Sequence, residues 1–318
     1  MVVGIDVAKS TLAVHLVLAD GKTRQKRCAN TPTGHAELVR WLDRHGAARA
    51  VIGLEATGGY QEAVALVLHD AGHHVSVINP VAIEAYGRSQ LRRAKTDPAD
   101  AALIADYVRT QGPAPWVPAP PEVRQLQALV RRLDALLEMQ TQETNRLELA
   151  AAIVRPSIDG VLAHLARDIA AIRQRIRDHI DQFPTLRAQR DLIVSIPGIG
   201  DTTAAIVLGE LPPLARFASA RQIAAFAGLV PAVRHSGTSV RGRGAIGRLG
   251  ASRLRKAMYF PALTAIRHNP PIQRFAARLQ AAGKPKMVIV VAVMRKLVHY
   301  IYGVLTHRRA FDPALATA

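Results

Sequence analysis

Patterns of hydrophobic and polar residues typical of strands and of helices follow one another over the first 85 residues of the chain. The strand patterns predict five strands, at 2–7, 12–18, 23–29, 50–56 and 74–80. Helical patterns lie between the later strands, at 35–46 and 58–72. Three early strands followed by helix, strand, helix and strand indicate an α/β domain built on a mixed sheet with some antiparallel pairing.

A further helix is expected at 94–110, where Gly112 and Pro113 end it. Prolines then recur at 113, 115, 118, 120 and 121. Proline cannot continue a helix or a strand interior, so this stretch is the clearest linker in the chain. The first domain is therefore expected to span 1–120.

Leucine and isoleucine repeat at alternating spacings of three and four after the linker. The two series are Leu126, Leu129, Leu133 and Leu136, and Leu162, Leu165, Ile169, Ile172, Ile176 and Ile180. Such a narrow apolar seam is typical of paired or coiled-coil helices, so we expect a helical segment over 121–190. The pattern fits an internal antiparallel pair and a dimer seam equally well.

The last part of the chain, 191–318, reads as mainly helical and rich in alanine, glycine and arginine. One loop, PAVRHSGTSVRGRGAIGRLG at 231–250, has no periodicity. The sequence thus predicts an α/β domain, a helical middle and a mainly helical third domain.

Charge separates these parts. The 318 residues carry 42 Lys and Arg against 24 Asp and Glu, a formal charge of +18. Residues 201–318 hold 18 of the basic residues and only three carboxylates, with none between Glu210 and Asp312. A basic stretch of this length without acidic neighbours in sequence indicates a polyanionic partner.

The polyanion is expected to be nucleic acid, not a membrane. The most apolar run, Met287–Met294, is cut by Arg295 and Lys296 and is far shorter than a membrane span of about 20 residues. The N-terminus lacks the pattern of a signal peptide, and one cysteine, Cys28, fits a reducing cytoplasm. An aromatic content of 4% favours contacts to phosphates over rows of stacked bases.

Four carboxylates stand out in the first domain. Asp6 and Glu55 end two of the predicted strands, and Asp97 and Asp100 begin the helix at 94–110. Taken singly, the first two suit solvated turns, Asp97 before Pro98 suits a helix N-cap, and Asp100 suits the first helical turn. Taken together, residues three apart on a helix and at neighbouring strand ends can meet at one point.

Oxygen ligands suit Mg²⁺, which is held by a few carboxylates together with phosphate oxygens and water. Two such ions about 4 Å apart can clamp the attacking and leaving oxygens of a phosphodiester transfer. Four acids in a nearly neutral domain, joined to a strongly basic one, indicate an enzyme that acts on nucleic acid.

Several motifs, taken in order, resemble one known family. GIDVAKSTLAV, LEATGGY, VSVINP and KTDPADAALIA resemble the RuvC-like, RNase H-fold domain of insertion-sequence transposases with an Asp-Glu-Asp-Asp site, the bridge-RNA-guided recombinases. RPSID, SIPGIG, FASARQIAAFAGLVP, HSGTSVRGRG and LRKAMYFPA resemble that family's C-terminal transposase domain. The resemblance covers nearly the whole chain and implies that Asp6, Glu55, Asp97 and Asp100 are catalytic metal ligands.

The loop HSGTSVRGRG reads from its residues as a phosphate-binding loop whose hydroxyls only donate hydrogen bonds. The resemblance implies instead that Ser236, before Gly237, is a nucleophile that becomes covalently joined to DNA; Ser239 and Ser252 are weaker candidates. Nucleic-acid contacts are expected from the surrounding basic residues Arg234, Arg241, Arg243, Arg248, Arg253, Arg255 and Lys256.

The resemblance implies an RNA-guided, site-specific DNA recombinase. Its Mg²⁺-binding carboxylates and its serine would form a composite site, a structured bridge RNA would select target and donor DNA, and homodimers would assemble to a tetramer. The protein would act in the bacterial cytoplasm, at the nucleoid. Two alternatives stand beside it: a metal-dependent RuvC-like endonuclease or Holliday-junction resolvase acting by hydrolysis, and an inactive relic that only binds nucleic acid.

Overall fold

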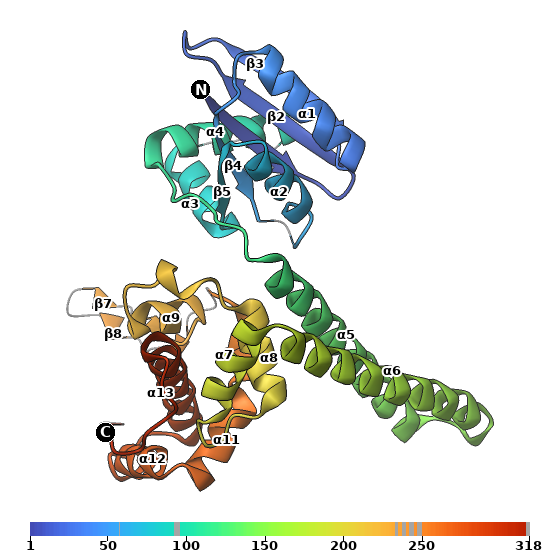
Figure 1. Ribbon diagram of the computed structural model, residues 1–318, viewed down its shortest axis with the longest axis vertical. Coiled ribbons are helices and arrows are strands. Elements are labelled where there is room, and N and C mark those ends of the chain that lie inside the picture. Colours follow the sequence, from blue (N-terminus) through green and yellow to red (C-terminus); the bar gives the residue numbers. More distant parts are fainter. Residues whose placement is uncertain are drawn as a thin grey trace. The chain divides into compact units, whose positions relative to one another are not determined.

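We describe the protein from a computed structural model, in which the chain forms two compact units, Met1–Pro118 and Ala119–Ala318 (Figure 1). The structure describes residues 1–56, 58–91, 96–232, 235–236, 240–241, 245–246 and 250–315, with the backbone alone described at 232 and in the three short pieces after it. Each unit is treated by itself below.

The first unit is built on a five-stranded mixed sheet. Its strands are β1 (Val2–Val7), β2 (Thr11–Val17), β3 (Thr23–Ala29), β4 (Val51–Glu55) and β5 (His74–Ile78). Their order in the sheet is β3-β2-β1-β4-β5. The first three pair antiparallel, whereas β4 lies parallel to both β1 and β5. The predicted mixed sheet is confirmed, and it is compatible with the RNase H-like fold that the resemblance implies.

Two pairs of helices cover the sheet. They are α1 (Pro32–Arg44) and α2 (Glu62–Asp70), and α3 (Pro80–Ser89) and α4 (Asp97–Gln111). Ile5 of β1 packs in one core with Leu38 of α1 and Leu68 of α2. Its neighbour Gly4 faces α4, because successive residues of a strand point to opposite faces. The sheet is therefore covered on both faces, with α4 crossing β1, β2 and β4 on one of them.

Helix α3 was not predicted from the sequence. It begins directly after β5, with the Asn79 side chain accepting a hydrogen bond from the Val81 amide and Pro80 in the first turn. An asparagine cap followed by proline is a helix-start signal, and it was present in the sequence.

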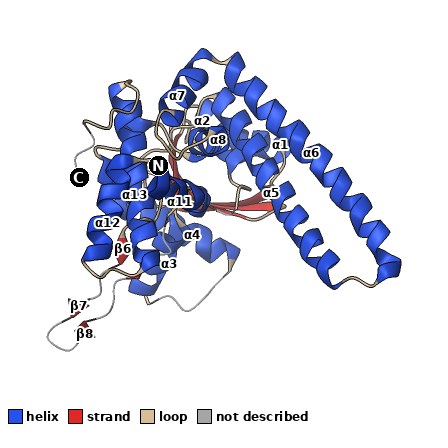
Figure 2. Ribbon diagram, turned by 90° about the horizontal axis from the view of Figure 1, so that it is seen from below, coloured by secondary structure: helices blue, strands red, loops and turns tan. Residues whose placement is uncertain are grey.

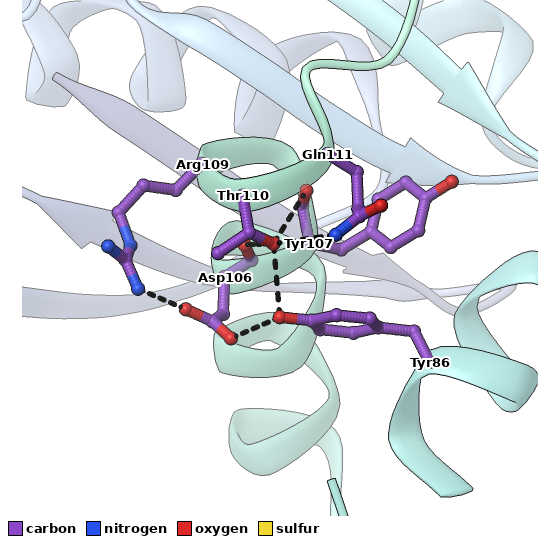
Figure 3. A network of polar contacts seen from close by, with 6 residues as sticks. All are labelled: Tyr86, Asp106, Tyr107, Arg109, Thr110 and Gln111. Atoms are coloured by element: carbon purple, nitrogen blue, oxygen red, sulfur yellow. Dashed lines mark hydrogen bonds and ion pairs between the residues drawn. The ribbon is translucent and has the colours of Figure 1, made fainter. Parts of the chain in front are cut away.

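A polar network joins α3 to the last turns of α4 (Figure 3). The Tyr86 hydroxyl donates to Oδ2 of Asp106 at 2.7 Å, and Arg109 donates to Oδ1 of the same carboxylate at 2.6 Å. The rings of Tyr86 and Tyr107 meet edge to face, with centroids 5.3 Å apart. These contacts hold α3 and α4 together as one layer on the sheet.

The second unit begins with two long helices, α5 (Pro121–Leu149) and α6 (Arg155–Gln182), joined through the short 3-10 helix η1 (Ala152–Val154). The two long helices lie side by side in Figures 1 and 2. Leu126 and Leu133 of α5 and Ile176 of α6 are buried in the same core. The apolar seam thus packs α5 on α6 within one chain.

Among its described residues, the second unit contains seven more helices. They are α7 (Pro184–Val194), α8 (Asp201–Glu210), α9 (Ala220–Phe226), α10 (Ser252–Ala257), α11 (Tyr259–His268), α12 (Pro270–Ala281) and α13 (Lys286–His307), with the 3-10 helix η2 (Leu214–Arg216). Residues of α5, α6, α7 and α8 share one continuous core. The division of this unit into separate domains at 121–190 and 191–318 stays a prediction.

Short strands interrupt the helices where a loop was expected from the sequence. They are β6 (Pro231–Ala232), β7 (His235–Ser236), β8 (Val240–Arg241) and β9 (Ala245–Ile246). β6 pairs with β9 and β7 pairs with β8, both antiparallel. The described part of this segment is therefore two small ribbons.

Helix α13 is the centre of the second unit. Within the described residues it is the one helix that is long and apolar enough to cross a membrane, and half of its apolar window is buried inside the protein. Val293 and Leu297 are fully covered, and the helix packs against α9, α11 and α12. Its apolar composition is accounted for by this core position.

Candidate functional site

Asp6 and Glu55 lie next to each other at one edge of the sheet. The parallel strands β1 and β4 are in register up to the pair Ile5 and Leu54, and the two carboxylates follow that pair on their strands. Adjacent strands are about 4.8 Å apart, so the backbones at Asp6 and Glu55 are direct neighbours. Both residues are half-buried, and each has a polar or electrostatic partner.

Two glycines allow a helix to lie close against this face. A Cβ atom at Gly4 would lie 2.1 Å from the Ala101 carbonyl oxygen, and one at Gly53 would lie 2.3 Å from a methyl group of Val108. Helix α4 can therefore lie directly on the sheet only because both positions lack a side chain. Asp6 and Glu55, two residues further along the same strands, share the face that α4 covers.

The N-terminus of α4 brings the other two acids to this face. Thr96 has the extended conformation of the helix cap, so Asp97 and Asp100 both lie in the first turn. The interpretation of Asp97 as the N-cap is thus wrong, because the cap is one residue earlier. The Asp100 amide donates to the Thr96 carbonyl oxygen at 2.8 Å, which closes the first turn.

One row of residues across the sheet connects α4 to Asp6. Asp6 pairs with Ala13 of β2, and Ala13 pairs with Arg27 of β3. An Arg27 guanidinium nitrogen lies 3.6 Å from Oδ2 of Asp97. The start of α4 therefore reaches the same row as Asp6, although the pair is exposed and correspondingly weak.

A small hollow of about 190 Å³ adjoins this contact, lined by residues of β2, β3 and the start of α4. Lys26, the neighbour of Arg27, is bonded to Glu37 on α1 at 2.5 Å, and that hydrogen bond lowers the pKa of the Glu37 carboxyl. Lys26 is thus used to hold α1 on its own side of the sheet. Arg27 is the basic residue that β3 directs toward the acidic edge.

The four acids share one edge without surrounding a metal position. Among the described residues, no three His, Cys, Asp or Glu side chains are grouped closely enough to hold a metal ion. The donor set itself is all carboxylate, which fits a hard divalent cation. Within the described residues, the side chain of Asp97 is about half exposed and its ion pair is the long contact with Arg27.

Ser236 lies in β7, where its backbone pairs with Val240 of β8, and its side chain lies outside the described part of the chain. The same holds for the side chain of Arg241. Arg234, Ser239, Arg243 and Arg248 also lie outside the described residues. Ser252 is exposed at the start of α10.

The remaining predicted nucleic-acid contacts have partners within the chain. The Lys256 ammonium donates to Asp134 at 3.0 Å and to Glu138 at 3.1 Å, and these hydrogen bonds, Asp134 first, raise the pKa of Lys256. Arg253 lies 4.0 Å from the Glu210 carboxylate, and Arg255 donates to the Ala227 carbonyl oxygen at 3.4 Å.

These contacts line a hollow of about 680 Å³ between α5 and the α10–α11 region. Carboxylates of α5 thus offset part of the charge of the basic segment. The sequence did not reveal that Asp134 and Glu138 pair with Lys256, because a count of charges along the chain does not show contacts between distant segments. Asp134 and Glu138 are four residues apart on a helix, which is the signal that they form a single acidic face.

Comparisons with known proteins give independent information. Residues 3–154 match the sequence model of the DEDD transposases of IS110 type, described as a transposase, a class that typically uses a divalent metal. Residues 190–277 match the model described as the transposase IS116/IS110/IS902 family. The first match contains all four acids, and the second contains Ser236.

Named relatives match over the whole chain. The pilin gene-inverting proteins of Moraxella bovis and Moraxella lacunata are each 32% identical over 98% of this chain and 97% of their own length. A putative transposase of Sinorhizobium fredii, y4pF/y4sB, is 25% identical over 98% of this chain and 86% of its own length. The names of these proteins describe DNA rearrangement, and none describes a hydrolytic nuclease.

Proposed function

The chain belongs to the IS110 family of transposases, and on this basis we propose that it is an RNA-guided, site-specific DNA recombinase that acts through a covalent phosphoserine intermediate. Family membership makes it an enzyme, a transposase or recombinase that acts on DNA. The guide, the nucleophile, the identity of the metal and the assembly are the parts that we add.

The observation that carries the proposal is the edge of the first unit. Asp6 and Glu55 are in register at the ends of two parallel strands, and the first turn of α4 carries Asp97 and Asp100 over the same face. Four carboxylates thus lie toward one edge of the sheet, and α4 can pack there because Gly4 and Gly53 lack side chains. This arrangement supports phosphodiester chemistry assisted by a cation.

Asp6, Glu55, Asp97 and Asp100 are the residues that would hold Mg²⁺. Bound there, Mg²⁺ would act as a Lewis acid on the scissile phosphate. The strands β1 and β4 fix the positions of Asp6 and Glu55. The first turn of α4, which packs on the same face of the sheet, carries Asp97 and Asp100. Asp97 would exchange its contact with Arg27 for the cation, which leaves Arg27 able to contact a backbone phosphate.

Ser236 would supply the nucleophile. Its Oγ attacks the phosphorus of one phosphodiester, a new P–O bond to serine forms, and the P–O bond to the deoxyribose oxygen of the leaving strand breaks. The serine proton is passed on, and the leaving oxygen ends as a hydroxyl. One phosphodiester has replaced another, so the hydroxyl of a second strand can reverse the step and rejoin DNA without an outside energy source.

Site-specific recombination is supported by the relatives. Two of them carry the name pilin gene-inverting protein, and inversion of a DNA segment requires cutting and rejoining at chosen positions. RNA guidance rests on the family resemblance and on a basic, aromatic-poor segment suited to backbone contacts. Nothing in the comparisons supports the hydrolytic alternative.

RNA guidance makes a direct prediction. Purified chain, supplied with donor and target DNA, is expected to form a recombinant junction only when the structured RNA transcribed from the flanking DNA is added. Amplification across the new junction measures the product, and an RNA of the same length with a scrambled sequence is the control. Junctions that form equally with the scrambled RNA would remove the guide from the proposal and leave the recombinase.

Assembly into dimers and then a tetramer is proposed to use the far end of the α5–α6 pair. Leu149 and Ile153 are 92% and 89% exposed there, and Val154 next to Ile153 is exposed as well. Met139 and Val161 are exposed further back along the same two helices. Apolar groups gathered at one end of a helical pair are costly in water and indicate a protein contact. We assign that contact to a second copy of the chain.

Changing Leu149 and Ile153 together to lysine is therefore expected to reduce the assembled protein to monomers, because charged side chains oppose burial of this surface. Light scattering coupled to gel filtration measures the mass. Val81→Lys is the matched control, since Val81 is an exposed apolar residue on α3 of the other unit. A double variant that assembles like the control would place the interface elsewhere.

A further inference from the structure

A third hollow, of about 730 Å³, lies along one side of α13. After α13 the chain turns at Arg308, whose φ of 50° is left-handed, and the following residues run back along the helix. The Phe311 amide donates to the Ser195 hydroxyl at 2.8 Å, which fixes the returning segment. We call this hollow the α13 pocket. Its walls are Lys296, His299, Tyr300, Gly303, Val304 and His307 on the helix, with Arg309, Ala310, Phe311, Asp312 and Leu315 on the returning segment.

The floor of the α13 pocket is unobstructed, and aromatic rings form part of its walls. A Cβ atom at Gly303 would meet no atom within 4 Å, so there is free space directly above the helix backbone. The rings of Tyr300 and Phe311 flank this part of the helix, with centroids 4.9 Å apart. The volume lies in the range of about 300–1,000 Å³ that is usual for sites of small organic ligands.

The α13 pocket is also cationic. Lys296, His307 and Arg309 line it, and Asp312 is the one carboxylate among its described lining residues. Burial, with a further contribution from Arg278, lowers the pKa of Lys296. Its ammonium lies 5.6 Å from the centre of the Tyr300 ring. A bound anion would stabilise the charged form of Lys296, which its surroundings now oppose.

Two lining residues hold polar atoms that the rest of the described chain does not satisfy. The Nε2 atom of His299 and the hydroxyl of Tyr300 are buried, and neither has a hydrogen-bond partner among the described residues. Buried polar atoms are normally paired, so these two leave unused hydrogen-bonding capacity in the wall of the α13 pocket. Both are covered by protein, so a ligand would pair with them after their side chains turn toward the cavity.

We propose that the α13 pocket binds one unpaired nucleotide of a nucleic-acid strand, with its base against Tyr300 and Phe311 and a phosphate near Lys296, His307 and Arg309. Aromatic walls, a cationic rim and unpaired polar atoms together suit a base joined to a phosphate. The nucleotide can come from an RNA or a DNA strand. This binding site goes beyond the proposed function, on which it rests only in taking nucleic acid as the ligand.

Gly303→Leu tests the α13 pocket without cutting any existing contact, because the new side chain enters open space. Gly160→Leu is the matched control, since Gly160 is also helical, in α6, and an added Cβ atom there would likewise meet no atom within 4 Å. Fluorescence anisotropy measures binding of the full chain to single-stranded RNA, single-stranded DNA and duplex DNA of one sequence.

Gly303→Leu is expected to weaken single-strand binding about tenfold or more, while duplex binding and the Gly160→Leu variant stay as wild type. Loss for RNA alone assigns the nucleotide to RNA, loss for DNA alone assigns it to DNA, and either supports the site. Equal single-strand binding by the two glycine variants would overturn it. Because the readout is binding, failure of the recombinase proposal leaves this result interpretable.

Photocrosslinking of the wild-type protein gives a test that does not depend on a variant. Single-stranded RNA or DNA containing 4-thio-substituted pyrimidines is irradiated on the protein, and the linked peptide is identified by mass spectrometry. Linkage to Tyr300 or Phe311, with competition by uridine monophosphate, is expected. Linkage only to other segments, or equal competition by inorganic phosphate, would overturn the assignment of a nucleotide.

Discussion

Replacement of Ser236 by alanine is expected to abolish the covalent protein–DNA adduct while leaving DNA binding intact. Alanine removes the oxygen that would form the bond to phosphorus, and it leaves the neighbouring basic residues, the proposed phosphate contacts, unchanged. The expected loss of strand exchange is at least about a thousandfold, as for removal of other enzymatic nucleophiles. A denaturing gel of labelled DNA measures the adduct, and a mobility-shift assay measures binding.

The matched controls are Ser239→Ala and Ser252→Ala. Ser252 is an exposed residue at the start of α10, beside Arg253 and Lys256, so its replacement removes a hydroxyl from the same basic unit. Both variants are expected to keep the adduct. An adduct that survives in Ser236→Ala and disappears in Ser239→Ala would move the nucleophile to Ser239.

The second large effect is expected at the acidic edge. Asp6→Ala and Asp100→Ala should each reduce strand exchange in Mg²⁺ by at least about a hundredfold, because each removes one of the carboxylates proposed to hold the cation. Asp6 lies near the end of β1, and Asp100 lies in the first turn of α4. The two variants therefore test whether both elements contribute to one site. Junction formation with fixed RNA and DNA measures the effect.

Asp20→Asn is the control for these variants. Asp20 is an exposed carboxylate in the turn between β2 and β3, where it is paired with Lys22. The register places this turn at the Val2 end of the sheet, opposite to Asp6. The Asp20→Asn variant should retain full activity. Undiminished exchange in Asp6→Ala or Asp100→Ala would reduce that acid to a structural role.

The sheet of the first unit was predictable because its signals are local. Short strand-type runs marked each strand, and turn residues lay between the elements, so all five predicted strands are present within one or two residues. The proximity of Asp6 and Glu55 also follows from a general rule, since the carboxyl ends of neighbouring parallel strands meet at one edge. Helix α3 was not predicted, although Asn79 as the N-cap and Pro80 in the first turn are sequence signals for the start of a helix.

The placement of α4 depends on packing that no local pattern shows. Glycine inside a strand signals a close approach by another backbone, and Gly4 and Gly53 are such positions, but their sequence does not say which helix approaches. The contact of Arg27 with Asp97 joins residues from different elements and follows only from that docking. The helix that carries Asp97 and Asp100 was thus predictable from the sequence, whereas its docking against Gly4 and Gly53 was not. The joint role of the four acids stays a prediction.

Charge along the chain was a partial guide in the second unit. The long stretch without carboxylates does contain the basic residues of the predicted interface, yet Lys256 is paired with Asp134, 122 residues away. Partners so distant in sequence meet only after α5 and α10 are packed. The surface that remains for nucleic acid is therefore smaller than the formal charge of +18 indicates.

The chemical nature of the cleaved DNA end tests the central claim most directly. The reaction is stopped with denaturant, the protein is digested with protease, and the DNA-linked peptide is identified by mass spectrometry. We predict a nucleotide joined through phosphate to the peptide that contains Ser236. DNA ends that carry a free phosphate and a free hydroxyl, with no peptide attached, would contradict the covalent mechanism and indicate hydrolysis at the carboxylates.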